Sequence, residues 1–211
     1  DGAPNNPVAR QMLAEHYLRT GEPKEALTVA QNASSALPDN QQLLDVLGRA
    51  QAANGEHNQA QASFNRMAAL QPKSPLPYLR MASAHLIAGE QAAAGDKLRK
   101  ALELDSNLLE AQQGLASLAM AAKKPEEALA IARTVQKQRP KEQVGYILEG
   151  DIHAAGKAWD QAAEAYRTGV KQSDSPELAI RLHNALVGAG KKPDADRWAG
   201  LDTQPPQGRH L

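Results

Sequence analysis

Small and apolar residues recur along this chain at an interval of 34 positions. Alanine stands at position 26 and returns after each interval, giving Ala26, Ala60, Ala94, Ala128 and Ala162. Within the first interval, a helix is indicated by apolar residues at helical spacing, namely Val8, Met12, Leu13 and Tyr17. A fixed interval of this length is typical of a repeat array.

The glycine and proline positions of the first interval predict a helix, a turn and a second helix. Gly21 ends the first helix, because glycine adopts the left-handed C-terminal conformation without a steric cost. Pro23 is suited to the first turn of the next helix, where its missing N–H does no harm. Pro38 closes that second helix. Each interval therefore predicts one helix-turn-helix unit in an all-α protein.

We predict about six such units in the chain. Their expected bounds are 7–40, 41–74, 75–108, 109–142, 143–175 and 176–201. A single helix pair has too little core to be stable alone, so stacking must bury its remaining apolar face on a neighbour. Residues 1–6 are expected to form a polar lead-in, and residues 202–211 a flexible tail.

The pattern within the units resembles the tetratricopeptide repeat (TPR) family. Small residues stand at the eighth and twentieth positions of a unit, large ones at the fourth, seventh and twenty-fourth, and proline at the thirty-second. The resemblance covers about Pro7 to Leu201. It implies a right-handed superhelix of antiparallel helix pairs, with the first helices lining a concave face. Four residues depart from the family pattern: Ala30 and Ala132 replace bulky residues, and Glu149 and His183 replace apolar or small ones.

Composition narrows the function classes. Lys plus Arg equals Asp plus Glu at 24 each, so there is no electrostatic footprint for nucleic acid or an anionic membrane. The absence of cysteine excludes disulfides and thiolate metal sites, and leaves the compartment open. No apolar run approaches the ~20 residues of a membrane span, so we expect no membrane insertion. Because the chain begins with Asp1-Gly2, we interpret it as part of a longer protein.

Motifs that resemble catalytic or ligand sites have structural interpretations. Glu126-Glu127 follows Pro125 in the first turn of a helix, where negative charge complements the helix dipole. The histidines lack metal-ligand spacing. The run 188–192 resembles a phosphate loop but lacks its first glycine and its Ser or Thr, so we interpret it as a helix C-terminus. Trp159 is interpreted as a packing residue. We therefore expect no enzyme, no cofactor and no metal.

The TPR resemblance implies a peptide-binding groove along the first helices, at positions two, five, nine, twelve and thirteen of a unit. The residues of this chain at those positions include Gln11, Glu15, Arg19, Asp45, Arg49, Leu76, Leu79, Ser83, Leu86, Ile87, Glu110, Gln113, Ser117, Met120, Val144, Ile147 and Asp151. The chaperone-binding branch holds a terminal carboxylate with Lys at position five and Asn at position nine. This chain has Gln11 with Glu15 and Asp45 with Arg49 at these positions instead, so we expect no carboxylate clamp.

The middle of this groove is expected to be apolar. Its apolar members are Leu76, Leu79, Leu86, Ile87, Met120 and Ile147. An exposed apolar strip usually marks a binding site. The alternative is that a neighbouring repeat, or another part of the full chain, covers these positions.

Three runs suggest a narrower placement within the family. GYILEGD at 145–151, AAEAY at 162–166 and LAIRLHNAL at 178–186 resemble the C-terminal region of the TPR lipoprotein of the exosortase/PEP-CTERM sorting system. That resemblance implies a scaffold in the cell envelope of a Gram-negative bacterium, linked to exopolysaccharide production and protein sorting.

The predicted function is a non-catalytic scaffold that recognises a protein segment, in the bacterial cell envelope or periplasm. One alternative is a periplasmic TPR segment of a machine for polysaccharide synthesis or export. A second is a cytosolic co-chaperone-type adaptor, which the missing clamp disfavours. A regulatory subunit of an enzyme is a further alternative, and the sequence does not separate it from the first.

Overall fold

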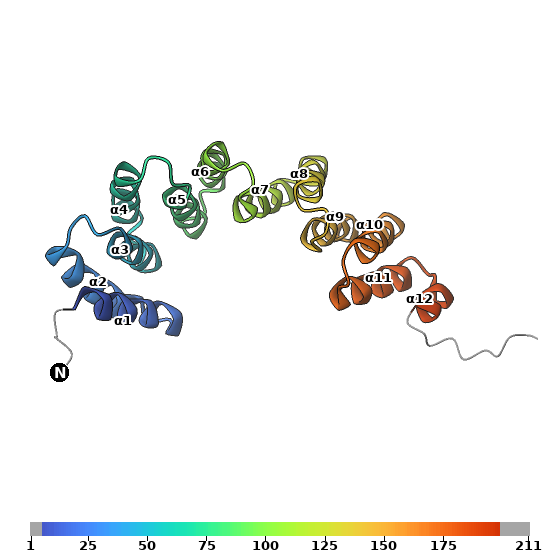
Figure 1. Ribbon diagram of the computed structural model, residues 1–211, viewed down its shortest axis with the longest axis horizontal. Coiled ribbons are helices and arrows are strands. Elements are labelled where there is room, and N and C mark those ends of the chain that lie inside the picture. Colours follow the sequence, from blue (N-terminus) through green and yellow to red (C-terminus); the bar gives the residue numbers. More distant parts are fainter. Residues whose placement is uncertain (1–5, 199–211) are drawn as a thin grey trace, which may run out of the picture. The chain divides into compact units, whose positions relative to one another are not determined.

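The computed structural model describes residues 6–198, and helices joined by short turns make up that range (Figure 1). The helices are α1 (Pro7–Thr20), α2 (Pro23–Ala36), α3 (Gln41–Ala53), α4 (His57–Leu70), α5 (Leu76–Ile87), α6 (Gln91–Leu104), α7 (Leu109–Ala121), α8 (Pro125–Gln138), α9 (Val144–Ala155), α10 (Trp159–Gln172), α11 (Pro176–Gly188) and α12 (Lys192–Trp198). No strand occurs among the described residues, which confirms the all-α class. The predicted tail 202–211, most of the lead-in and the last residues of the sixth unit lie outside this range.

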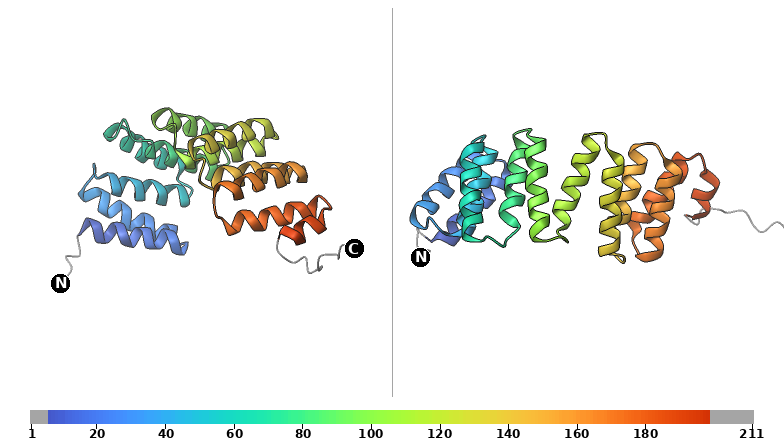
Figure 2. Two further views of the ribbon diagram at one scale, coloured as in Figure 1. Left: turned by 45° about the vertical axis from the view of Figure 1, so that its right-hand side comes forward. Right: turned by 90° about the horizontal axis from the view of Figure 1, so that it is seen from above.

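Contacts between helices divide the chain into two compact units, with the division after Leu115 in α7. In the N-terminal unit, each helix packs on the next from α1 to α6, and the first helices α1, α3 and α5 also pack side by side (Figure 2). In the C-terminal unit, α8 packs on α9, α9 on α10, α10 on α11, and α11 on α12. No described helix has the length and apolar character needed to cross a membrane.

One turn geometry separates the two helices of every pair. The fifteenth residue of each predicted unit has a positive φ: Gly21 (80°), Gly55 (83°), Gly89 (78°), Lys123 (59°), Lys157 (58°) and Gly190 (74°). A left-handed residue at a helix C-terminus lets the following N–H groups bond to the last carbonyls. The glycines made this turn visible in the sequence. The two lysines adopt the same conformation against their intrinsic preference, which costs about 1–2 kcal/mol.

Core packing between the two helices of a pair depends on complementary side-chain sizes. Gly48 of α3 faces the ring of Phe64 on α4, and Gly150 of α9 faces Tyr166 on α10. A Cβ atom added to Gly48 would lie 2.4 Å from the Phe64 ring. A large residue on the second helix therefore requires glycine on the first.

The same matching of sizes extends to the following helix and explains two departures from the family pattern. Ala30 packs in one cluster with Val46 of α3, and Ala132 packs in one cluster with Leu148 of α9. The next first helix thus supplies the volume that these alanines lack. The residue pattern of a single unit cannot show how a larger neighbour fills the space beside each alanine, because the two residues belong to different units.

A polar contact explains the third departure. Glu149 of α9 is only 18% exposed, accepts a 2.6 Å hydrogen bond from Gln136 Nε2 and lies 3.5 Å from Arg133. These α8 partners satisfy the carboxylate where the family usually has an apolar residue. Trp159 packs on α11, because a Cβ atom at Gly188 would lie 2.7 Å from its ring. The indole of Trp159 therefore helps to join α10 to α11.

Candidate functional site

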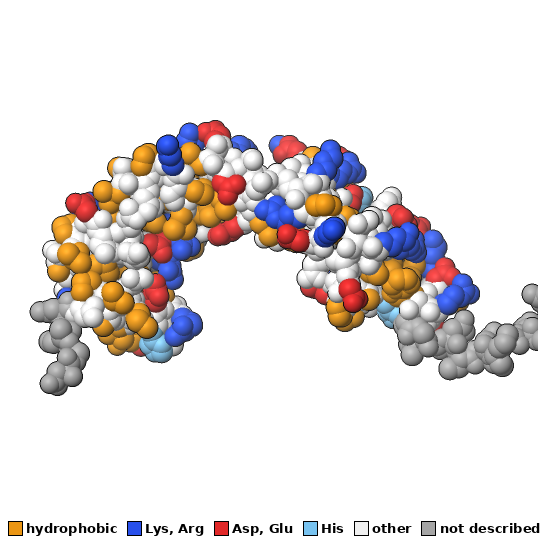
Figure 3. All heavy atoms as spheres, in the orientation of Figure 1, with side chains coloured by type: hydrophobic (Ala, Val, Ile, Leu, Met, Phe, Trp, Pro, Cys, Tyr) orange, Lys and Arg blue, Asp and Glu red, His pale blue; other side chains and the backbone are white. Residues whose placement is uncertain are grey.

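Three first helices form a candidate binding surface in the N-terminal unit. We call it the first-helix face; its residues are Gln11, Glu15 and Leu18 of α1, Asp45 and Arg49 of α3, and Leu76, Arg80, Ser83 and Ile87 of α5. In Figure 3, acidic and basic side chains lie next to each other along the edge of the unit that these helices form. Side-by-side packing of α1, α3 and α5 brings these residues together.

Asp45 is the centre of the charged contacts on this face. Its carboxylate accepts two hydrogen bonds from Arg80, Nε to Oδ1 at 2.5 Å and Nη2 to Oδ2 at 3.2 Å. Arg49 Nη1 donates a longer bond to Oδ2 at 3.3 Å. The Asp45 side chain is 15% exposed. Two guanidinium groups thus share one carboxylate, and these three side chains together carry one net positive charge.

An apolar pocket of about 260 Å³ lies beside the two arginines. Its lining residues are Leu18, Arg49, Ala52, Phe64, Arg80, Ser83, Ala84 and Ile87. Phe64 is fully buried, whereas Ile87 is 60% exposed. The pocket therefore combines a hydrophobic floor with a rim that carries positive charge and one hydroxyl group.

A second pocket has Asp45 among its lining residues. It measures about 210 Å³ and is lined by Gln11, Gln41, Gln42, Asp45, Met67, Gln71 and Leu76. Three of its four amide side chains already have partners: Gln11 donates to Glu15 at 3.0 Å, and Gln71 donates to Gln41. This polar pocket presents amide groups of the kind that bond to a peptide backbone.

The predicted groove residues of the N-terminal unit differ in accessibility. Leu86 and Ile87 are exposed, and Leu76 is half-buried. Leu79 is buried at 4% exposure, so its expected place in an exposed strip is wrong. The helix α5 packs on α3, α4 and α6, and this packing leaves Leu79 inaccessible. Arg19 is exposed and contacts His16, and Gln113 is exposed on α7.

The predicted groove residues of the C-terminal unit mainly support packing. Met120 and Ile147 are half-buried, and each packs against a core cluster of this unit. Ser117 is exposed on α7. Asp151 accepts a 2.5 Å hydrogen bond from Tyr166 and another of 2.5 Å from Arg181 Nη1. Asp151 is thus already bonded to protein groups.

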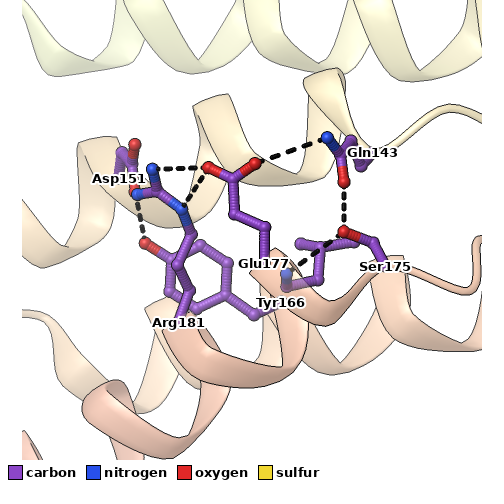
Figure 4. Close-up of polar contacts among 7 residues, drawn as sticks. Gln143, Asp151, Tyr166, Ser175, Glu177 and Arg181 are labelled. Atoms are coloured by element: carbon purple, nitrogen blue, oxygen red, sulfur yellow. Dashed lines mark hydrogen bonds and ion pairs between the residues drawn. The ribbon is translucent and has the colours of Figure 1, made fainter.

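A polar network extends from Asp151 across α9, α10 and α11 (Figure 4). Arg181 also bonds Glu177 at 3.0 Å, and Glu177 accepts from Gln143 at 3.4 Å. Ser175 donates to Gln143 and caps α11 through the N–H of Leu178. Burial raises the pKa of Tyr166, and its hydrogen bond to Asp151 raises that pKa further. The network joins three consecutive helices of the C-terminal unit.

Sequence reasoning missed several residues of the first-helix face and its pockets. They are Leu18, Gln41, Phe64, Gln71 and Arg80. One signal could have found Arg80. Asp45 and Arg80 are 35 positions apart, and Asp151 and Arg181 are 30 apart, so each pair of opposite charges is separated by close to one repeat. Opposite charges at such a separation indicate contacts between successive first helices.

Among residues 6–198, no three His, Asp or Glu side chains gather as a metal site requires. The motifs with structural interpretations have local partners. Glu127 pairs with Lys124 at 2.8 Å, His85 Nδ1 lies 2.6 Å from Glu90, and Lys191 pairs with Asp160 at 2.8 Å. None of these contacts forms part of the first-helix face.

Solved structures show the same fold at low sequence identity. Pseudomonas aeruginosa PilF has a TM-score of 0.64 at 13% identity, covering 96% of this chain and 93% of PilF. A thermophilic TPR protein of Thermus thermophilus has a TM-score of 0.59 at 16% identity, covering 86% and 100%. MamA from Desulfovibrio magneticus RS-1 has a TM-score of 0.56 at 18% identity, covering 77% and 94%.

Comparison at the level of sequence identifies the family. A search of curated proteins finds no match. None of these comparisons points to the sorting-system lipoprotein that three runs of the sequence resemble. The family model for the tetratricopeptide repeat matches residues 11–75 and 114–177, together more than half of the chain. This chain therefore belongs to the tetratricopeptide repeat family.

Proposed function

We propose that this chain is a non-catalytic scaffold that binds an extended segment of a partner protein across the first-helix face. One observation carries the proposal: two pockets open along three successive first helices, and Asp45 of one pocket bonds to Arg49 and Arg80 of the other. An extended segment presents alternate side chains to a surface at a spacing of ~7 Å, so it suits a row of small pockets. Two solved structures with this fold are complexes of several proteins, Cut9-Hcn1 and Naa15/Naa10 bound to HypK-THB.

Site-specific cross-linking tests this proposal. A photo-reactive residue is placed at Ser83 or Ile87 on the first-helix face, and at Leu70 near the end of α4 as a matched control. Ile87 and Leu70 are both exposed apolar residues, at 60% and 40%. In extract of the source cells, both face positions should cross-link to the same protein, and Leu70 should not.

A charge substitution separates specific binding from surface adhesion. Ile87→Glu places a carboxylate at the rim of the apolar pocket and should abolish the Ser83 cross-link, while Leu70→Glu should leave it intact. Equal cross-linking from Leu70, or none from either face position, would refute the proposed function.

We further propose that the scaffold works in the bacterial cell envelope, in a system for exopolysaccharide production or protein sorting. The support is the sequence resemblance at 145–151, 162–166 and 178–186. Fractionation of source cells tests it. Recovery from the periplasmic or membrane fraction supports the envelope. Recovery only from the cytosol would favour the co-chaperone-type adaptor instead.

A further inference from the structure

The first-helix face has more positive than negative charge at the apolar pocket. Arg49 and Arg80 both line this pocket, and Asp45 is the one carboxylate that bonds to them among the described residues. Two guanidinium groups that share one carboxylate keep a net positive charge, which favours an incoming second carboxylate.

The two arginines are bonded differently to Asp45. Arg80 uses two nitrogens in a forked contact, with distances of 2.5 and 3.2 Å. Arg49 uses only Nη1, at 3.3 Å, and its Nε and Nη2 find no partner within residues 6–198. Its side chain is 35% exposed. Arg80 therefore neutralises Asp45, and Arg49 is the arginine with donors to offer a ligand.

The apolar part of the same pocket can hold one large side chain. An apolar cavity of about 150 Å³ accommodates benzene, and this pocket measures about 260 Å³. Leu18 and Ile87 provide aliphatic contact surface, and the buried Phe64 lines the floor of the pocket. A leucine- or phenylalanine-sized group would fit here with its backbone close to Arg49 and Ser83.

The arrangement of the two pockets indicates how a peptide would lie. Asp45 lines the polar pocket, and its carboxylate bonds to the two arginines of the apolar pocket. A segment that fills the apolar pocket can therefore continue over Asp45 towards Gln11 and Gln41. This continuity suits an internal segment rather than a chain terminus.

We propose that this face selects internal peptide segments in which an apolar side chain lies next to Asp or Glu. The apolar side chain of the peptide enters the apolar pocket. Arg49 binds the neighbouring carboxylate through its Nε and Nη2 donors. This inference rests on the proposed function and adds the chemistry of the bound segment.

Selection from an unbiased peptide library tests the inference. A phage-displayed library of random peptides, about ten residues long, is selected on the full chain. Each peptide is inserted within a coat protein, so that neither of its ends is free. The selected consensus is then synthesised with both ends blocked, in three forms: the parent peptide, a form with the acid changed to its amide, and a form with the apolar residue changed to Ala. Binding is measured by fluorescence polarisation at two salt concentrations.

Variants of the protein identify the arginine that binds the acid. Arg49→Gln should weaken the parent peptide about tenfold and leave the amide form unchanged. Because Arg80 still neutralises Asp45, this variant should keep its fold. Asp45→Asn should tighten the parent peptide about threefold, since it removes the competing carboxylate. Arg66→Gln is the matched control: Arg66 lies on α4, pairs with Asp39 at 2.7 Å and does not line the pocket.

The outcomes are distinguishable. An apolar-acidic consensus that weakens with Arg49→Gln but not with Arg66→Gln supports the inference. Selected peptides could block the cross-link at Ile87 and yet bind equally well in the acid and amide forms. That result would overturn the inference and leave the proposed function standing. Peptides that bind only with a free C-terminal carboxylate would also overturn it. A library that returns no binder would count against it, while the cross-linking experiment judges the scaffold function separately.

Discussion

Gly150→Ala tests the rule that a large residue on a second helix requires glycine on the first. A Cβ atom at Gly150 would lie 2.1 Å from Tyr166 Cε1 and 2.5 Å from both Cδ1 and Cζ. Atoms this close must separate. The ring of Tyr166 has little freedom to move, because it is 3% exposed and its hydroxyl bonds to Asp151 at 2.5 Å.

The size of the effect follows from three contributions. Overpacking a close-packed core costs about 1–3 kcal/mol. If the ring moves instead, its hydrogen bond to the carboxylate is lost, which costs a similar amount. Replacing glycine by alanine inside a helix contributes about 1 kcal/mol in the opposite direction. We therefore expect Gly150→Ala to destabilise the C-terminal unit by up to about 2 kcal/mol.

Urea unfolding followed by tryptophan fluorescence measures this change locally. The chain has two tryptophans, Trp159 on α10 and Trp198 on α12, and both belong to the C-terminal unit. The signal therefore reports the unit that contains Gly150. Gly156→Ala is the matched control, because its nearest atom would lie at 3.5 Å and its φ of −83° suits alanine. That control should be neutral or stabilising by less than about 1 kcal/mol.

A double-mutant cycle isolates the steric origin of the effect. Tyr166→Leu shortens the facing side chain, so Gly150→Ala should cost at least about 1 kcal/mol less in that background. Equal destabilisation in both backgrounds would refute the reasoning. So would a stabilised Gly150→Ala single variant, because helix propensity would then outweigh the contact.

Three further predictions concern turns, titration and the small-residue positions. Lys123→Gly and Lys157→Gly should each raise the free energy of unfolding by about 0.5–1 kcal/mol in thermal melts, because glycine relieves a left-handed lysine; lower melting temperatures would contradict this. Because the pKa of Tyr166 is raised above 10.0, its contribution to stability is complete below about pH 10 and is lost at higher pH. The stability difference between the native chain and Tyr166→Phe, from urea midpoints, should therefore shrink as the pH rises from about 8 to about 11; a constant difference would argue against it. Ala94→Leu should cost about 1–3 kcal/mol through overpacking at a fully buried position, and a melting shift below about one degree would contradict that assignment.

Residue pattern along the chain determined the elements and their order. The interval of 34 and the glycine and proline positions predict helix pairs because helix ends and turns depend on local backbone preferences. The same local logic predicted the turn at Gly21, and the interval places Gly55 and Gly89 at the same position of the next two units. It did not extend to Lys123 and Lys157, because tertiary packing imposes the left-handed conformation where local preference opposes it.

Only the tertiary structure decided which side chains meet. Leu79 and Ile87 lie on the same helix and are both apolar, yet contact with neighbouring helices buries the first and leaves the second exposed. Arg80 of the following repeat bonds to Asp45, and Phe64 of a second helix lines the apolar pocket. Periodicity specifies the face of a helix on which a residue lies. The distances that make a pocket or an ion pair depend on how separate repeats pack.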